Sequence, residues 1–294
     1  MLMGLPAAAR RITFAAQLEQ AFLRACRLDV EALKPGNVGL HGDGHRMQVA
    51  DFRASAEAAA PALCSADGTV GERILGAMRA TWQSVGCNTN LGIVLGCAPI
   101  AHAALHQKDG ESLRASLQRT LDALDVTDAS HAYEAIRLAQ PAGLGRRETD
   151  DVAAPAQITL LQAMTVAGHR DSIASLYANG YALIFEHLLP VHSAARRRGR
   201  DERWAAATVF MFCLALIPDT HIMRKHGPET ALSVREDAIQ MLDRFDQSDD
   251  PVMMQDALRT WDVVLKTAGI NPGTSADLTV VTIFLASALA LTGA

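Results

Sequence analysis

The sequence lacks the cysteine pattern of a disulfide framework or of a zinc site. Its five cysteines are scattered over 294 residues, and no two of them form a CxxC pair. Cys26, Cys97 and Cys213 lie within apolar runs, where a free cysteine behaves as a small buried hydrophobic residue. We therefore expect neither disulfide bonds nor a zinc site.

Long runs of basic residues are also missing. The net charge is −5, the isoelectric point is near 6.0, and the longest basic run is the triplet 196–198. Proteins that bind nucleic acid usually present a broad basic face, because the phosphate backbone dominates their affinity. We expect no nucleic-acid partner.

Apolar stretches long enough to cross a membrane are not apparent either. The two longest, 204–218 and 278–294, fall short of the roughly 20 residues that a spanning helix needs, so they are predicted to be buried core helices. Arg10 and Arg11 near the N-terminus are not followed by an apolar stretch with a cleavage signal. We expect a cytoplasmic protein that does not enter a membrane.

The alternation of apolar and polar residues that marks a half-buried strand is nowhere sustained. Hydrophobic residues make up 49% of the chain and aromatic residues only 5%, so alanine and leucine dominate, and both favour helix. We therefore predict an all-α fold, a single large domain of about ten to twelve helices over residues 1–294. The expected helices are 12–33, 50–61, 69–85, 90–106, 111–124, 128–140, 155–166, 170–189, 201–217, 229–246, 250–268 and 274–291.

The helix at 12–33 has the clearest pattern, with a broad apolar stripe and with Arg24, Arg27 and Asp29 largely off it. The stretch that begins at Pro141 and runs to Asp151 is the expected flexible connection. No repeat and no low-complexity linker divides the chain, which favours one domain.

A long polar loop follows the first helix. Residues 34–51 contain four glycines, two histidines and two aspartates, whereas helix connections usually have about two to eight residues. Lys34 supplies a charge suited to phosphate, and Asn37, His41 and Asp51 are further reactive groups in or beside the loop. The alternative is a simple helix end, because the Pro-Gly pair after Lys34 stops a helix.

Two further polar clusters precede predicted helices. Asn88, Thr89 and Asn90 lead into an apolar helix, where one of the first two would act as the N-cap and the helix N-terminus would attract an anion. Arg170 and Asp171 open another helix, and Asp171 is favourable there through the helix dipole alone.

The last two clusters lie in the C-terminal third. Asp219, His221, Arg224 and Lys225 crowd into a short segment directly after a very apolar helix, which favours a functional role over a structural one. Residues 271–278 include Asn271, Ser275 and Asp277. The spacing of Thr274 and Asp277 is that of a capping box, but this leaves Asn271 and Ser275 unexplained. The carboxylates among these clusters are candidate Mg²⁺ ligands or general bases.

In this order, the segments resemble those of the triphosphoribosyl-dephospho-CoA synthase family. The matching stretches are Lys34-Pro35-Gly36-Asn37-Val38, Asp51-Phe52 with Ser55, Asn88-Thr89-Asn90-Leu91-Gly92, His169-Arg170-Asp171, Asp219-Thr220-His221-Ile222 and Asn271-Pro272-Gly273-Thr274-Ser275-Ala276-Asp277-Leu278. No single stretch is diagnostic, but the ordered set is specific and covers most of the chain.

The resemblance implies an all-α transferase that moves the 5-triphosphoribosyl unit of ATP to the 2′-hydroxyl of 3′-dephospho-CoA and releases adenine. ATP and Mg²⁺ are thus expected at the site. We assign binding of the nucleotide to ten residues: Lys34, Asn37, Asn88, Thr89, Asn90, Arg170, Arg224, Lys225, Asn271 and Ser275. The predicted metal ligands are Asp171, Asp219 and Asp277, and the predicted catalytic residues are Asp219, His221, His41 and Asp51.

One segment departs from the citrate-lyase branch of this family. That branch typically reads Asn-Thr-His-Lys-Gly where this chain has Asn88-Thr89-Asn90-Leu91-Gly92. The acceptor is therefore open: it is dephospho-CoA or another cofactor precursor, for example in tetrahydromethanopterin or methanofuran biosynthesis. A non-catalytic nucleotide-binding protein is the alternative outside enzymes. A homodimer is compatible with these observations.

Overall fold

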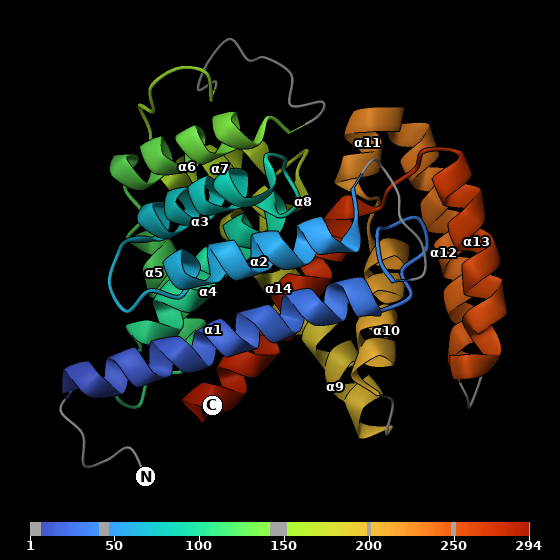
Figure 1. Cartoon of the computed structure of the whole chain (residues 1–294), viewed down its shortest axis with the longest axis horizontal. Coiled ribbons are helices and arrows are strands. Elements are labelled where there is room, and N and C mark those ends of the chain that lie inside the picture. Colours follow the sequence, from blue (N-terminus) through green and yellow to red (C-terminus); the bar gives the residue numbers. More distant parts are fainter. Residues whose placement is uncertain (1–6, 41–46, 142–151, 199–200, 248–250, 294) are drawn as a thin grey trace.

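The computed structural model describes residues 7–40, 47–141, 152–198, 201–247 and 251–293. These residues form fourteen α-helices, a π-helical segment and a short 3-10 helix, and none of them lies in a β-strand (Figure 1). The predicted all-α fold is confirmed, with slightly more helices than expected. The predicted flexible stretch beyond Pro141 falls mostly outside the described residues, as does His41.

The helices have these bounds: α1 Ala7–Glu31, α2 Val49–Leu63, α3 Val70–Val85, α4 Leu91–Leu105, α5 Leu113–Asp122, α6 Val126–Ala139, α7 Leu160–Ala167, α8 Ser172–Ala178, α9 Leu189–Arg197, α10 Glu202–Leu216, α11 Thr220–His226, α12 Pro228–Gln247, α13 Gln255–Thr267 and α14 Gly273–Thr292. The π-helical segment is Ile184–Leu188, and the 3-10 helix is Pro251–Met254.

Two apolar cores share helix α10. The larger core gathers side chains of α1 to α8 around α14, and the smaller one lies between α10, α12 and α13. Val209 and Cys213 of α10 belong to the larger core, whereas Phe210 and Leu214 belong to the smaller one. In Figure 1, α12 and α13 accordingly stand to one side of the main bundle, with α10 between.

Helices α1 and α14 cross the larger core in opposite directions. Phe22 of α1 and Phe284 of α14 meet edge to face, with ring centroids 5.9 Å apart. Asp29 lies seven residues after Phe22 and Asp277 seven residues before Phe284, which is about two helical turns in each case. The end of α1 and the beginning of α14 therefore reach the same end of the bundle (Figure 1).

Two helix predictions needed correction. The predicted helix at 170–189 is divided, because Gly180 and Tyr181 both have a left-handed backbone, with φ of 55° and 59°, that ends α8. The separate short helix α11 was not predicted.

The prediction that the longest apolar stretches are too short to cross a membrane also needed correction. Helix α14 has 20 residues and is long and apolar enough to cross a membrane. Helices α10 and α11, which are bent at the break between them, meet the same criterion of length and composition when they are taken together. However, 67% of the most apolar window of α14 is buried inside the structure, as in a core helix.

Helix α4 contains a proline whose effect is compensated from α8. Pro99 has no N–H to donate to the carbonyl of Leu95, four residues earlier. The Tyr177 hydroxyl of α8 donates to that carbonyl at 2.7 Å. The Tyr181 hydroxyl donates to the neighbouring carbonyl of Gly96 at 2.9 Å, although Gly96 has a normal helical donor in Ile100.

We predict that Tyr177→Phe destabilises the protein more than Tyr181→Phe does. Loss of the Tyr177 hydroxyl leaves a buried carbonyl without a donor, which costs about 1–3 kcal/mol. Tyr181→Phe is the matched control, because the Gly96 carbonyl keeps its helical partner. Urea unfolding of the two variants measures the difference, and equal losses would contradict the role given to Pro99.

Candidate active site

Asp219 joins the beginnings of two helices. Its Oδ1 atom accepts hydrogen bonds from the backbone N–H groups of His221 (2.9 Å) and Ile222 (3.0 Å), which caps α11. Its Oδ2 atom accepts from the backbone N–H and the hydroxyl of Ser275, at 2.7 and 2.8 Å, in the first turn of α14. Asp219 is only 1% exposed. Burial raises its pKa, and these four hydrogen bonds oppose that shift.

Threonine hydroxyls bring a third helix to the same place. The hydroxyls of Thr220 and Thr274 lie 3.0 Å apart, which links α11 to α14. The backbone N–H of Ser172, at the beginning of α8, donates to the Thr220 hydroxyl at 3.4 Å. The N-termini of α8, α11 and α14 therefore meet.

Asp171 caps α8 and holds Arg224. Its Oδ1 atom accepts from the backbone N–H groups of Ile173 and Ala174 at 2.9 and 3.0 Å. Its Oδ2 atom accepts from Nη1 of Arg224, on α11, at 2.6 Å. Two residues predicted for metal and phosphate thus bind each other, and they connect α8 to α11 a second time.

Lys34 is buried rather than open to a ligand. Its side chain is 1% exposed and forms an ion pair with the buried Asp29. Its ammonium also donates to Oδ1 of Asn37 at 2.6 Å, and Asn37 donates to Oδ1 of Asn271 at 2.9 Å. This chain of contacts fixes the loop after α1 against the segment before α14. Lys34 therefore stabilises the frame of the site, and its contact with a phosphate stays a prediction.

Sequence reasoning missed two carboxylates of this frame. Asp29 is 3% exposed, although the helical pattern placed it off the apolar stripe. Asp262 of α13 accepts from the backbone N–H of Gly36 at 2.8 Å and from Lys266 at 2.9 Å. Nothing local in the sequence marks Asp29 or Asp262 as part of the site, because the burial of both depends on contacts with distant segments.

The polar segment before α4 packs against α2 and α3. Oδ1 of Asn88 accepts from the backbone N–H of Leu91 at 3.1 Å. The N-cap of α4 is nevertheless Asn90, whose side chain makes no capping hydrogen bond, so the prediction of Asn88 or Thr89 as the N-cap was wrong by one or two residues. The Thr89 hydroxyl donates to Ser55 of α2 at 2.6 Å, and Nδ2 of Asn90 donates to the hydroxyl of Thr81 at 3.0 Å. All three predicted side chains therefore position the N-terminus of α4.

Asp51 has a capping role of its own. Its Oδ2 atom accepts from the backbone N–H of Gln48 at 2.8 Å, in the capping box of α2. Its charge also contributes, after burial, to a raised pKa of Cys87, so Asp51 lies near the segment before α4.

Asp277 differs from the other predicted carboxylates. It makes no hydrogen bond or ion pair within the part of the chain that the structure describes. A Cβ atom at Gly92, in the first turn of α4, would overlap its carboxylate, so only glycine fits there. Burial and then the charges of Asp29, Asp219 and Asp171 raise the pKa of Asp277 well above its usual range, against a lowering effect of Lys34.

The five predicted segments therefore converge. Contacts join the loop after α1 and the N-termini of α2, α4, α8, α11 and α14 around Asp277. Two predicted residues lie apart from this network: Arg170 and Lys225 are exposed, and neither forms an ion pair among the described residues. No three Asp, Glu, His or Cys side chains of the described residues are placed to share a metal ion.

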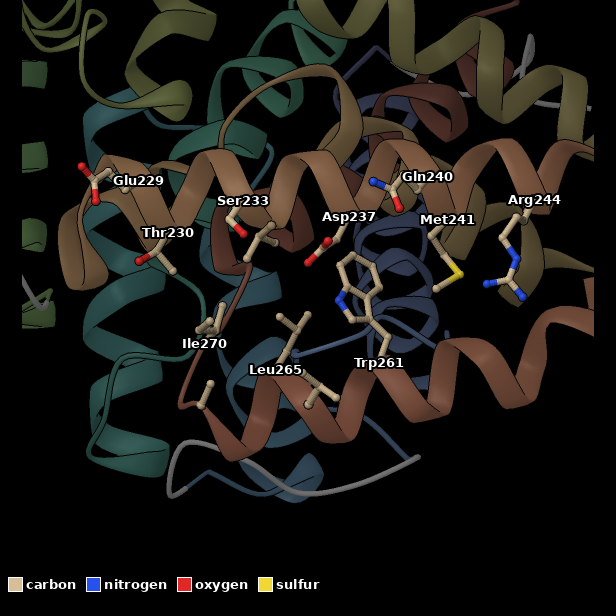
Figure 2. Close-up of a pocket in the computed structure, with 13 residues that line it drawn as sticks. Glu229, Thr230, Ser233, Asp237, Gln240, Met241, Arg244, Trp261, Leu265 and Ile270 are labelled. Carbon is tan, nitrogen blue, oxygen red and sulfur yellow. The ribbon is translucent and has the colours of Figure 1, made fainter.

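The groove between α12 and α13 is a different feature. Figure 2 shows side chains of the two helices facing each other across it, with Trp261 directed toward Asp237 and Met241. Its volume is about 640 Å³, and its charged lining residues are Glu229, Asp237 and Arg244, so acidic groups outnumber basic ones. Three of its lining residues adjoin the network: Ile270 is the neighbour of Asn271, Trp261 is the neighbour of Asp262, and Leu265 lies against Gly36.

We predict that only one of two isosteric variants loses stability. Asp219→Asn places an amide nitrogen against N–H donors and should cost about 1–3 kcal/mol. Asp277→Asn loses no contact and should leave stability unchanged or raise it.

The second effect should depend on pH. Because the pKa of Asp277 is higher in the folded than in the unfolded protein, the wild type loses stability relative to Asp277→Asn as the pH rises above about 4. Urea unfolding from pH 5 to 8 measures both effects. A larger loss for Asp277→Asn than for Asp219→Asn would contradict these roles.

Comparison with known proteins shows which family this chain is similar to. Residues 15–293 match the CitG family, described as ATP:dephospho-CoA triphosphoribosyl transferase. A Citrobacter koseri protein named "Probable 2-(5''-triphosphoribosyl)-3'-dephosphocoenzyme-A synthase" is 30% identical over 107 residues, which is 36% of this chain and 35% of that protein. The alignment thus spans about a third of that relative's length.

A solved structure has the same fold. It is a protein from Archaeoglobus fulgidus named "putative triphosphoribosyl-dephospho-coA synthase", which superimposes with a TM-score of 0.61 at 24% identity. The superposition covers 79% of this chain and 96% of that one. The match to the family extends over nearly the whole chain, from the first turns of α1 to the end of α14, and so this protein belongs to the CitG family.

Proposed function

We propose that this chain transfers the 5-triphosphoribosyl group of ATP to the 2′-hydroxyl of 3′-dephospho-CoA and releases adenine. Family membership supports the reaction. One observation in the site carries the proposal: the uncommitted Asp277 carboxylate lies where several helix N-termini meet. A triphosphate favours helix N-termini, and a carboxylate suits the positive charge that develops on the ribose.

The chemistry needs a base for the attacking hydroxyl and negative charge near the ribose, while the triphosphate stays whole. Asp277 is the available carboxylate, because both oxygens of Asp219 and of Asp171 already accept hydrogen bonds. Its raised pKa suits a group that takes up a proton. Asp219 and Asp171 hold the helix ends around it.

Phosphate binding falls to three cations around α8 and α11. Arg170 and Lys225 are exposed and have no ion-pair partner among the described residues. Arg224 gives one N–H to Asp171 and keeps other donors of its guanidinium. Lys34, being buried, acts on the site only through its charge.

Magnesium fits this donor set as a companion of the nucleotide. A nucleotide-bound Mg²⁺ needs only one or two protein carboxylates, its other ligands being phosphate and water. One oxygen of Asp277 would hold it, since the carboxylate has no protein donor within the described residues, and the other oxygen would stay open to the attacking hydroxyl. The ion would neutralise charge on the triphosphate.

His221 is the described residue best placed for proton transfer to adenine. Its ring lies against Gly273 at the beginning of α14, where a Cβ atom would be 3.0 Å from Nδ1. The other candidate, His41, lies outside the described residues. A cytoplasmic location and a homodimer remain proposals for this enzyme.

One observation favours a different acceptor as the second candidate. Asn90 and Leu91 replace the His-Lys pair of the citrate-lyase branch, and both are buried, at 4% and 9% exposure. Neither side chain carries a charge, so these two positions cannot attract an acceptor phosphate as a His-Lys pair would. A related cofactor precursor with a reactive hydroxyl is the alternative acceptor.

We predict that incubation with ATP, Mg²⁺ and dephospho-CoA yields free adenine and neither ADP nor AMP. Asp277→Asn should lower turnover roughly 10²–10⁴-fold, because it removes the proton acceptor, while the protein stays folded. Chromatography of the bases and nucleotides measures both. Adenine release only with another acceptor would select the second candidate, and ATP binding without adenine release from any acceptor would refute both.

We also predict that ATP with Mg²⁺ raises the melting temperature, since a ligand of the folded state stabilises it. Arg170→Ala and Lys225→Ala should each reduce that shift. Lys108→Ala is the matched control, because Lys108 is exposed beyond the opposite end of α4. An equal shift in all four proteins would exclude these two cations from the phosphate site.

A further inference from the structure

A second cavity lies between α1 and α2, and it is lined largely by arginine. Its volume is about 600 Å³. Arg24 and Arg27 of α1 and Arg53 of α2 line it, together with the shorter side chains of Leu23 and Ala56. On each helix these positions have the three- and four-residue spacing of a single helical face. We call this cavity the arginine groove.

One end of the arginine groove adjoins the candidate active site. The chain reverses between α1 and α2, so the end of α1 lies beside the beginning of α2 (Figure 1). Arg27 is four residues before the end of α1, and Arg53 is four residues after the beginning of α2. Both therefore lie at the end where the loop after α1 enters the network. Cys26, which also lines the groove, is close enough to Asp277 for that carboxylate to contribute to its raised pKa.

The charge of the groove is opposite to that of the chain as a whole. Its lining holds three guanidinium groups and a single carboxylate, that of Glu57, whereas the chain carries −5. Arg24 is bound to Glu202, and Nε of Arg27 is 3.8 Å from Glu31. Arg53 forms no ion pair within the described part of the chain. Arg27 and Arg53 thus keep donors for an anion.

The apolar part of the groove follows Arg27 and Arg53. Leu23 lies one turn before Arg27 on α1, and Ala56 lies one turn after Arg53 on α2, so both are farther from the site. Gln20 is one turn farther again and supplies an amide. From the site outward, the groove therefore offers the charges of Arg27 and Arg53, then the apolar side chains of Leu23 and Ala56, flanked by Arg24 and Glu57, and then the amide of Gln20.

We propose that the arginine groove binds the acceptor, a nucleotide whose diphosphate carries a long uncharged arm. This inference rests on the proposed function. The attacking hydroxyl of such a molecule is on the ribose, the diphosphate is attached to the same ribose, and the arm extends beyond. This order matches that of the groove, with the diphosphate at Arg27 and Arg53 and the amide-containing arm along Leu23 toward Gln20. The donor triphosphate fits less well, because it has no apolar part.

The test measures binding of dephospho-CoA and of ATP with Mg²⁺ separately, by calorimetry on the full chain. Arg27→Gln combined with Arg53→Gln should weaken dephospho-CoA binding at least about ten-fold, as expected for lost charge-assisted hydrogen bonds, and should leave ATP binding unchanged. Arg79→Gln is the control, since Arg79 is an exposed arginine of α3 that pairs with Glu134 of α6 outside the groove.

A second probe tests the order of the ligand in the groove. 4′-Phosphopantetheine contains the arm and one phosphate but no nucleoside, and it should displace dephospho-CoA and not ATP. Unchanged dephospho-CoA affinity in the double variant, or weakened ATP binding in its place, would overturn the proposal, and so would a wild-type protein that binds no dephospho-CoA. Failure of the proposed function is distinguishable, because there the wild type binds both ligands and releases no adenine.

Discussion

The four hydrogen bonds accepted by Asp219 are the constraint on which the rest of the site depends. Two of them begin α11 and two fix the first turn of α14, so one buried carboxylate sets the angle between these helices. The Thr220–Thr274 contact, the position of His221 against Gly273 and the approach of Asp277 to Gly92 all follow from that angle. A buried charge is costly unless it is fully hydrogen-bonded, and here it is.

The converging helix N-termini explain why so many carboxylates gather at the site without an equal number of positively charged side chains. Asp171, Asp219 and Asp51 each bind backbone N–H groups at a helix beginning, where the helix dipole favours negative charge. Asp277 has no such partner among the described residues and bears the repulsion of its neighbours. The site therefore holds one carboxylate in an unfavourable state, as expected where a cation or a developing positive charge is to be received.

Much of the fold and the site could be predicted from local patterns, and the remainder depends on contacts between distant residues. The polar segment before α4 and the apolar helix after it are properties of adjacent residues, so the sequence sufficed to place the beginning of α4 within one residue. The ion pair of Lys34 could not be foreseen, because its burial depends on α10 and on Asn271, which is 234 residues from Asn37. The division of the helix at 170–189 depends on the left-handed backbone of Gly180 and Tyr181, and Tyr181 is bound through its hydroxyl to Gly96, 85 residues away in the sequence.

Helices α8 and α11 have seven residues each, and both begin at the site. An isolated helix of that length is not stable in water, so each persists only while its caps and its packing partners are in place. Opening of either helix would separate Asp171 from Arg224 and release the Thr220 hydroxyl from Ser172. Local unfolding here is therefore the same event as disassembly of the site, and slowed amide hydrogen exchange in α8 and α11 would report directly on its occupancy.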